Sequence, residues 1–207
     1  MLSSQSQSLK MGHNYLNSGR EITMQLDPLS DNSLMLKVRE GDLQKLGLLF
    51  ERYKNILFGY FFKLSKDREV SEDLVQMVFV RVIKYRHAYR GDGSFKIWIF
   101  HIARNIQVDY WRKEKKLGNK VDDYQLEDRL TVDNSIDPKE ESLQLLERAL
   151  GLLPDDKREL IVLSKLKGMK YKEIGLMMNL SEPIVKVRAF RALKALKVKY
   201  EEIEQTL

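Results

Sequence analysis

The chain has 207 residues, 43% of them apolar and 32% charged, with a net charge of +6; this fits a soluble, charge-rich helical protein and excludes a disordered chain. It has no cysteine and three scattered histidines, which excludes a disulfide scaffold and argues against a metal site, so we expect no cofactor. No apolar run approaches the roughly 18 residues that span a bilayer, and the N-terminus lacks an apolar signal core, so we expect a cytoplasmic protein with no membrane insertion of its own.

The first third of the chain predicts a tail followed by helices. Residues 1–29 are rich in Ser, Asn and Gln without an apolar period, which predicts a disordered or loosely attached tail. Ser30 starts a first helical pattern, and residues 43–64 place apolar side chains at steps of three and four, typical of one helical face. Ser71 is expected to cap a further helix that runs to Tyr85, with Asp73 in its first turn and a buried stripe of Leu74, Val75, Val78, Phe79 and Val82.

A glycine-containing loop and a long helix follow. Arg90 to Ser94 includes two glycines and predicts a loop. The pattern after it predicts a helix over Phe95–Lys116. Trp98 lies at helical spacing with other apolar residues, so we expect it in the core rather than on a base-stacking surface.

An acidic segment then divides the chain. Between Val121 and Glu141 eight acids face two bases, a net charge of −6, with one proline and few apolar residues. This predicts a flexible linker over residues 118–141. We also consider that the negative charge of this linker imitates the charge of a nucleic acid in the cleft or exit path of a partner protein.

The last third is strongly basic. Twelve bases face three acids between Lys157 and Lys199, a net charge of +9, which is a nucleic-acid footprint. Lys170–Met178 predicts a short helix, Asn179 to Ser181 a tight turn with Ser181 as N-cap, and the next residues a helix with Pro183 in its first turn. Its inward side chains should be Ile184, Val185, Leu193 and Leu196, and its outward ones Lys186, Val187, Phe190, Arg191 and Lys194.

A basic helix after a short helix and a tight turn is the geometry that enters a major groove. Arginine can bind guanine with two hydrogen bonds, whereas lysine neutralises phosphate. The alternative is an ordinary three-helix bundle with a basic, solvated face.

Three segments of this module resemble region four of bacterial sigma factors: Leu153–Glu159, Gly168–Gly175 and Val185–Ala192. The resemblance implies that the helix from Glu182 to about Leu196 binds the −35 promoter element. Pro183-Ile184 departs from the family, which often has a small residue and Thr there. The residues implied in −35 binding are Lys186, Val187, Arg188, Phe190, Arg191 and Lys194.

The first module resembles sigma region two, at Glu72–Arg81 and over Tyr89–Lys113. The resemblance implies polymerase binding by Asp73, Gln76 and Phe79; without it, Asp73 is only a dipole partner and Gln76 a solvated residue. The second segment resembles the part that captures the melted −10 strand, where a glycine loop can hold an unstacked base. The residues implied there are Arg90, Gly91, Asp92, Arg104, Asn105, Asp109, Arg112 and Lys113.

The sequence is therefore identified as an all-α member of the extracytoplasmic-function (ECF) group of sigma factors, with no enzymatic activity. The expected layout is a tail (1–29), region two (30–117), linker (118–141), region four (142–200) and a short tail (201–207). The expected partners are core RNA polymerase, duplex −35 and single-stranded −10 DNA, and an anti-sigma factor. The alternatives are a one-component operator-binding regulator and a sigma mimic that titrates an anti-sigma factor.

Overall fold

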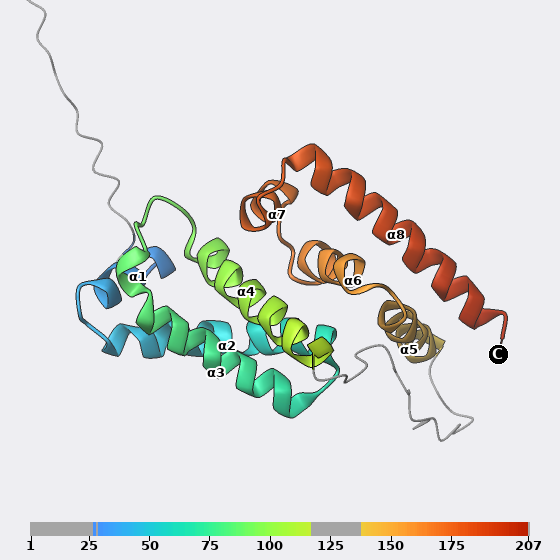
Figure 1. Ribbon diagram of the computed structural model, residues 1–207, viewed down its shortest axis with the longest axis horizontal. Coiled ribbons are helices and arrows are strands. Elements are labelled where there is room, and N and C mark those ends of the chain that lie inside the picture. Colours follow the sequence, from blue (N-terminus) through green and yellow to red (C-terminus); the bar gives the residue numbers. More distant parts are fainter. Residues whose placement is uncertain (1–26, 28, 117–137, 207) are drawn as a thin grey trace, which may run out of the picture.

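The structure is a computed structural model that describes residue 27 and residues 29–116 and 138–206. Every regular element in these ranges is a helix, which confirms the predicted all-α class. The first module contains α1 (Asp31–Arg39), α2 (Gln44–Ser65), α3 (Arg68–Lys84), a 3-10 turn η1 (Arg86–Ala88) and α4 (Phe95–Lys116). The second contains α5 (Pro138–Gly151), α6 (Asp155–Ile161), a π-helical turn η2 (Val162–Leu166), α7 (Tyr171–Met178) and α8 (Glu182–Glu204) (Figure 1).

The core of the first module lies between α2, α3 and α4, with α1 packed against α2. The rings of Tyr53 and Phe95 meet edge to face, with centroids 5.2 Å apart, and join α2 to the start of α4. Trp98 is partly buried and packs against Tyr89, so it belongs to the core only in part. The predicted stripe of α3 is buried as expected: Leu74, Val75, Val78, Phe79 and Val82.

The start of α3 differs from the prediction. The helix begins at Arg68, and its N-cap is Asp67, whose carboxylate accepts a hydrogen bond from the Val70 N–H at 3.0 Å. Ser71 is not the cap: it is fully buried inside the helix, and its hydroxyl donates to the Asp67 carbonyl. Asp73 therefore lies beyond the first turn, where the helix dipole has little effect.

Two boundaries of the second module also differ. The helix α5 begins at Pro138, so the last four residues of the predicted linker are helical, with proline at the helix start where its missing N–H costs least. The helix α8 continues to Glu204, so most of the expected tail at 201–207 is its last turn. The rest of the predicted linker and nearly all of the N-terminal tail lie outside the described residues.

Arg158 has a structural role, although in the sequence it counts only as one of the basic residues between Lys157 and Lys199. Its side chain is 2% exposed and donates to the carbonyl oxygens of Leu150, Gly151 and Leu153 at 2.7–3.1 Å. These carbonyls end α5 and the following turn, where intrahelical partners are lacking. A further hydrogen bond of 3.2 Å reaches the carbonyl of Leu64 at the end of α2. Arg158 thus closes a helix end and joins the two modules.

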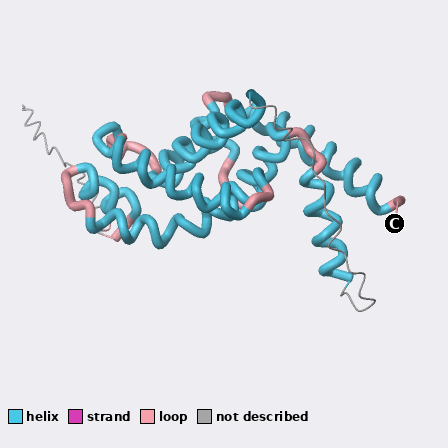
Figure 2. The backbone as a smooth tube through the Cα atoms, turned by 60° about the horizontal axis from the view of Figure 1, so that its bottom comes forward, coloured by secondary structure: helices cyan, strands magenta, loops and turns pink. Residues whose placement is uncertain are grey.

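The two modules pack against each other, with α7 beside α4 and with α6 and η2 beside α2. Figure 1 labels the helices of both modules, and Figure 2 shows the same backbone from another side, with every regular element of the described residues a helix. Lys96 of α4 donates to the Lys167 carbonyl at 3.3 Å, and Lys63 forms an ion pair with Glu147. The ammonium group of Lys167 lies so close to Gly59 that a Cβ there would be only 2.7 Å from it. The buried core consequently continues from one module into the other.

Candidate nucleic-acid interface

The helix-turn-helix of the second module depends on two backbone features of its turn. Asn179 adopts the left-handed conformation (φ 56°), which reverses the chain after α7 and suits asparagine better than most residues. Gly175 lies under the turn, where a Cβ would be 2.6 Å from the Leu180 carbonyl oxygen. The turn can therefore approach α7 only over a glycine. Ser181 occupies the N-cap position of α8 with an extended backbone, but its hydroxyl makes no capping hydrogen bond.

The outward face of α8 is as predicted, while one inward residue is wrong. Val185 is buried and Leu193 and Leu196 are partly buried, but Ile184 is 45% exposed. Ala189 and Ala192 occupy the inward positions instead, because the helix packs closely on α6 and α7. The exposed side chains are Lys186, Val187, Arg188, Phe190, Arg191 and Lys194.

The basic side chains of this face of α8 differ in whether they form ion pairs within the protein. Lys186 forms an ion pair of 3.0 Å with Glu182 one turn earlier. Arg188, Arg191 and Lys194 form no side-chain hydrogen bond or ion pair with any described residue. Phe190, 70% exposed, lies among them. Exposed apolar groups at Val187 and Phe190 beside unpaired bases favour an interaction surface over a merely solvated helix face.

The loop before α4 borders a hollow between the modules. Arg90 and Asp92 are exposed, and Gly91 has φ +79°, a conformation that favours glycine. The wall from the first module also includes Gly93, Ser94, Ile97, Trp98 and His101. Leu176 and Met177 of α7 form the opposite wall. The loop predicted to hold an unstacked base thus faces the helix-turn-helix.

Arg104 is engaged across the same boundary. Its guanidinium lies 3.2 Å from the Glu159 carboxylate of α6, which also accepts a hydrogen bond of 2.9 Å from the Tyr60 hydroxyl. Glu159 is only 3% exposed, and this burial raises its pKa, although Arg104 and Tyr60 oppose the rise. Burial of the Tyr60 hydroxyl, assisted by the same carboxylate, raises the pKa of Tyr60. Arg104 is therefore paired inside the protein rather than free on the surface.

The remaining predicted residues of α4 lie further along its exposed side. Asn105 is exposed and only 3.4 Å from the His101 ring. Asp109 pairs with Arg81 of α3 at 3.0 Å and, more weakly, with Arg112 at 3.6 Å. Arg112 and Lys113 are exposed in the last turns of the helix. These residues form a polar strip beside Arg104, in which Asp109 orients the two arginines.

Phe79, predicted with Asp73 and Gln76 to bind a protein partner, is only 6% exposed; it packs edge to face on Phe50 of α2, 4.9 Å between centroids. Asp73 and Gln76 are exposed. Three exposed apolar side chains on the same face of α3 were not predicted: Met77, Val80 and Ile83. Their spacing of three from one to the next, outside the buried stripe, was the available indication.

Three other sequence-based expectations concern the acidic linker, metal binding and membrane insertion. The acidic linker lies outside the described part of the chain apart from its last residues, so its imitation of nucleic acid stays a hypothesis. Among the described residues, no cluster of three or more histidines, acids or cysteines could hold a metal ion. No helix within the same ranges is long and apolar enough to cross a bilayer.

Comparisons with known proteins match both modules. Residues 49–117 match the family Sigma-70 region 2, and residues 143–196 match Sigma-70, region 4. The chain is 34% identical over 155 residues to the ECF RNA polymerase sigma factor SigM of Bacillus subtilis, covering 73% of this chain and 93% of SigM.

Two solved structures share the fold. CnrH, in a complex with the cytosolic domain of CnrY, has a TM-score of 0.64 at 23% identity, covering 83% of this chain and 97% of CnrH. The sigma factor RpoE of Bartonella quintana, in a complex with the anti-sigma factor NepR, has a TM-score of 0.60 at 22% identity, covering 76% and 98%.

The two family matches, in order on one chain with an exposed helix-turn-helix, show that it belongs to the sigma-70 family of RNA polymerase sigma factors. Within that family it is an ECF sigma factor, as its similarity to SigM shows. Such a factor directs RNA polymerase to promoters and is not itself an enzyme. The match of the first module also answers the alternative of a one-component regulator, which would leave that module unexplained.

Proposed function

We propose that this sigma factor divides promoter recognition between its modules, with region two over residues 30–117 and region four over 142–200. Region two docks on core polymerase and captures the single-stranded −10 element, and region four binds the duplex −35 element. The observation that carries the proposal is the presence of two separate surfaces, one exposed on α8 and one partly covered on α4 with its preceding loop. Because bacterial RNA polymerase acts in the cytoplasm, we propose that this protein is located in the cytoplasm.

The proposed −35 surface combines three kinds of contact. Arg188 and Arg191 can each donate two hydrogen bonds to a guanine edge, because neither guanidinium is engaged within the described chain. Val187 and Phe190 offer exposed apolar groups that suit thymine methyls. Lys194, and Lys186 once it leaves Glu182, would neutralise phosphates.

The proposed polymerase surface is the exposed face of α3. Asp73 and Gln76 supply polar groups, and Met77, Val80 and Ile83 supply apolar area of the kind that protein interfaces bury. Phe79 supports this face from below through its contact with Phe50, so we assign it a packing role and not a direct contact.

The proposed −10 surface requires a change in the arrangement of the modules. The loop Arg90, Gly91 and Asp92 would hold an unstacked base, and Asn105, Arg112 and Lys113 would hold the strand beside it, with Asp109 orienting Arg112. Arg104 can join them only when its guanidinium leaves Glu159. We therefore propose that region four moves away from α4 before the −10 strand binds.

A protein inhibitor is a further proposed partner. RpoE of Bartonella quintana, which shares this fold, was solved with the anti-sigma factor NepR. An anti-sigma factor that bound across the two modules of this protein would keep Arg104 and the hollow beside it covered.

The test is run-off transcription by core polymerase on genomic fragments, with and without the protein. We expect new transcripts that depend on both surfaces, so that Asn105→Ala and Arg191→Ala each reduce them at least about tenfold. The matched controls are Asn55→Ala and Lys165→Ala, which remove exposed side chains elsewhere. Transcripts that are insensitive to Arg191→Ala and Asn105→Ala would overturn the assignment of surfaces.

A further inference from the structure

The helix α1 presents three side chains of one face to the loop before α4. Asn32, Leu36 and Arg39 follow each other at steps of four and three, so they project from the same side of the helix. Each contacts a different part of the backbone between Tyr89 and Phe95. The loop is thus supported by a helix that lies 50 to 63 residues earlier in the chain.

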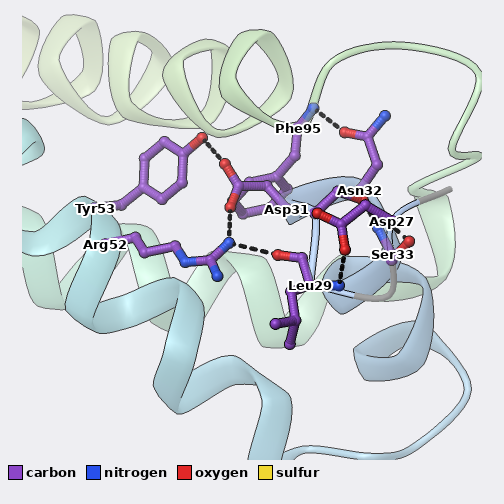
Figure 3. Close-up of polar contacts among 9 residues, drawn as sticks. Asp27, Leu29, Asp31, Asn32, Ser33, Arg52, Tyr53 and Phe95 are labelled. Carbon is purple, nitrogen blue, oxygen red and sulfur yellow. Dashed lines mark hydrogen bonds and ion pairs between the residues drawn. The ribbon is translucent and has the colours of Figure 1, made fainter.

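Asn32 makes the most specific of these contacts. Its amide nitrogen donates to the Gly93 carbonyl at 2.9 Å. Its amide oxygen accepts from the Phe95 N–H at 2.8 Å, the bond drawn in Figure 3. The second bond satisfies an N–H in the first turn of α4, which has no intrahelical acceptor. One side chain therefore fixes both the end of the loop and the beginning of the helix.

Leu36 and Arg39 support the earlier part of the loop. A Cβ at Gly91 would lie 2.9 Å from the Leu36 methyl group, so the loop backbone rests directly on that side chain. Arg39 donates to the Tyr89 carbonyl at 3.3 Å. With Asn32, they hold the backbone at three points and leave Arg90 and Asp92 exposed.

The helix α1 is itself held in place at its first residue (Figure 3). The Asp31 carboxylate accepts a hydrogen bond of 2.6 Å from the Tyr53 hydroxyl and forms an ion pair of 2.6 Å with Arg52, both on α2. Burial, assisted by the hydrogen bond to Asp31 and by its charge, raises the pKa of Tyr53, which strengthens the preference for the protonated hydroxyl that donates to Asp31. This anchor fixes the position from which Asn32 reaches the loop.

We infer that Asn32 is a positioning residue for −10 strand capture, acting through the loop and without touching DNA. The inference rests on the proposed role of that loop. A loop already fixed in its binding shape loses less conformational freedom when a base enters it, which increases affinity. Without Asn32 the loop must be ordered at the moment of binding, and we expect about tenfold weaker capture of the −10 strand.

Two substitutions separate this role from simple stability. Asn32→Asp keeps an oxygen that accepts from the Phe95 N–H, but it places an acceptor against the Gly93 carbonyl and so releases the loop. We expect it to bind the −10 strand about as poorly as Asn32→Ala while its helix remains capped. Asn55→Asp makes the same chemical change at an exposed position of α2 and is the matched control.

The experiment uses holoenzyme and a promoter from the run-off assay, premelted over the −10 element, with single abasic sites placed along the strand. Wild-type holoenzyme should lose affinity most at the captured base. If Asn32 acts through the loop, Asn32→Asp and that abasic site will cost no more together than either alone, while effects at other positions add. Polymerase binding and affinity for the −35 duplex should stay unchanged.

The two possible failures are distinguishable. Effects that add at every position, or an Asn32→Asp variant with wild-type affinity, would overturn the positioning role alone. A wild-type holoenzyme that is indifferent to abasic sites along the whole strand would instead overturn the proposed role of the loop.

Discussion

The two proposed DNA-binding surfaces of this sigma factor are in different states. On α8, Arg188, Arg191 and Lys194 are exposed and unpaired within the described chain, so this surface can meet a duplex as it stands. On α4, Arg104 is paired with Glu159, and the hollow beside the loop is closed on one side by Leu176 and Met177.

The difference indicates that the packing of the two modules covers only one of the two proposed surfaces. The part of the molecule that covers the proposed −10 surface is the second module itself, through Glu159 of α6 and through Leu176 and Met177 of α7. The side chains of the proposed −35 surface on α8 are exposed in this same arrangement. Promoter recognition by this protein should accordingly proceed from the duplex to the melted strand.

The largest expected effect is a loss of stability at Arg158, the residue that joins the second module to the first. Arg158→Met leaves four carbonyl oxygens without their buried donor, at Leu64, Leu150, Gly151 and Leu153. We expect a loss of at least about 3 kcal/mol in the free energy of unfolding. Chemical denaturation of the full chain measures it, with Lys165→Met as an exposed control. A change below about 1 kcal/mol would contradict the structural role.

The next largest effect should expose the proposed −10 surface on α4, which the second module covers. Glu159→Ala leaves the Arg104 guanidinium in the interface without its carboxylate, which disfavours the packed arrangement by about 2 kcal/mol, less than for a fully buried pair because Arg104 is 28% exposed. The free protein should separate its modules and bind single-stranded −10 DNA more tightly, as measured by inter-module energy transfer and fluorescence anisotropy. Glu69→Ala, an exposed acid on α3, should change neither.

Two substitutions on α8 should distinguish base contacts from phosphate contacts on the proposed −35 surface. Arg191→Ala should weaken −35 binding by about 1–3 kcal/mol and relax the preference at one base pair, because a bidentate contact is lost. Lys194→Ala should weaken binding to all sequences alike and lower the salt dependence by about one counterion. Titrations of holoenzyme on duplexes at several salt concentrations separate the two. Identical behaviour of the variants would contradict the division into base and phosphate contacts.

The smallest effect is a gain in stability beneath the covered surface. Gln107 of α4 is fully buried, and neither atom of its amide has a hydrogen-bond partner among the described residues. Gln107→Met keeps a similar volume and removes the polar atoms, so we expect about 1 kcal/mol of added stability. Thermal unfolding checks this, and DNA binding should stay the same. Destabilisation would show that the amide is satisfied in solution.

The sequence predicted the helices well because their cores follow regular spacing. The buried stripe of α3, the outward face of α8 and the limits of α4 all came from steps of three and four. It failed at positions where a neighbour decides the outcome. Asp67 displaced Ser71 as a cap, and close packing of Ala189 and Ala192 left Ile184 exposed.

The site was predicted as a set of residue types but not as a set of partners. No local pattern indicates that Arg104 meets Glu159, or that Arg158 is buried, because both follow from how two distant modules pack. The same holds for Asn32, whose two partners lie 61 and 63 residues away. Resemblance to the family predicted the surfaces, and only the fold shows which of their residues are paired within the protein.

The need for the modules to separate can be tested directly because the chain contains no cysteine. His101 and Leu176 are both exposed and line the same hollow from opposite modules, so cysteines at these two positions can be joined by a short, reducible crosslinker. We predict that the crosslinked protein binds −35 duplex normally but gives no run-off transcript until the link is reduced. Full transcription by the crosslinked form would contradict the separation of region four from α4.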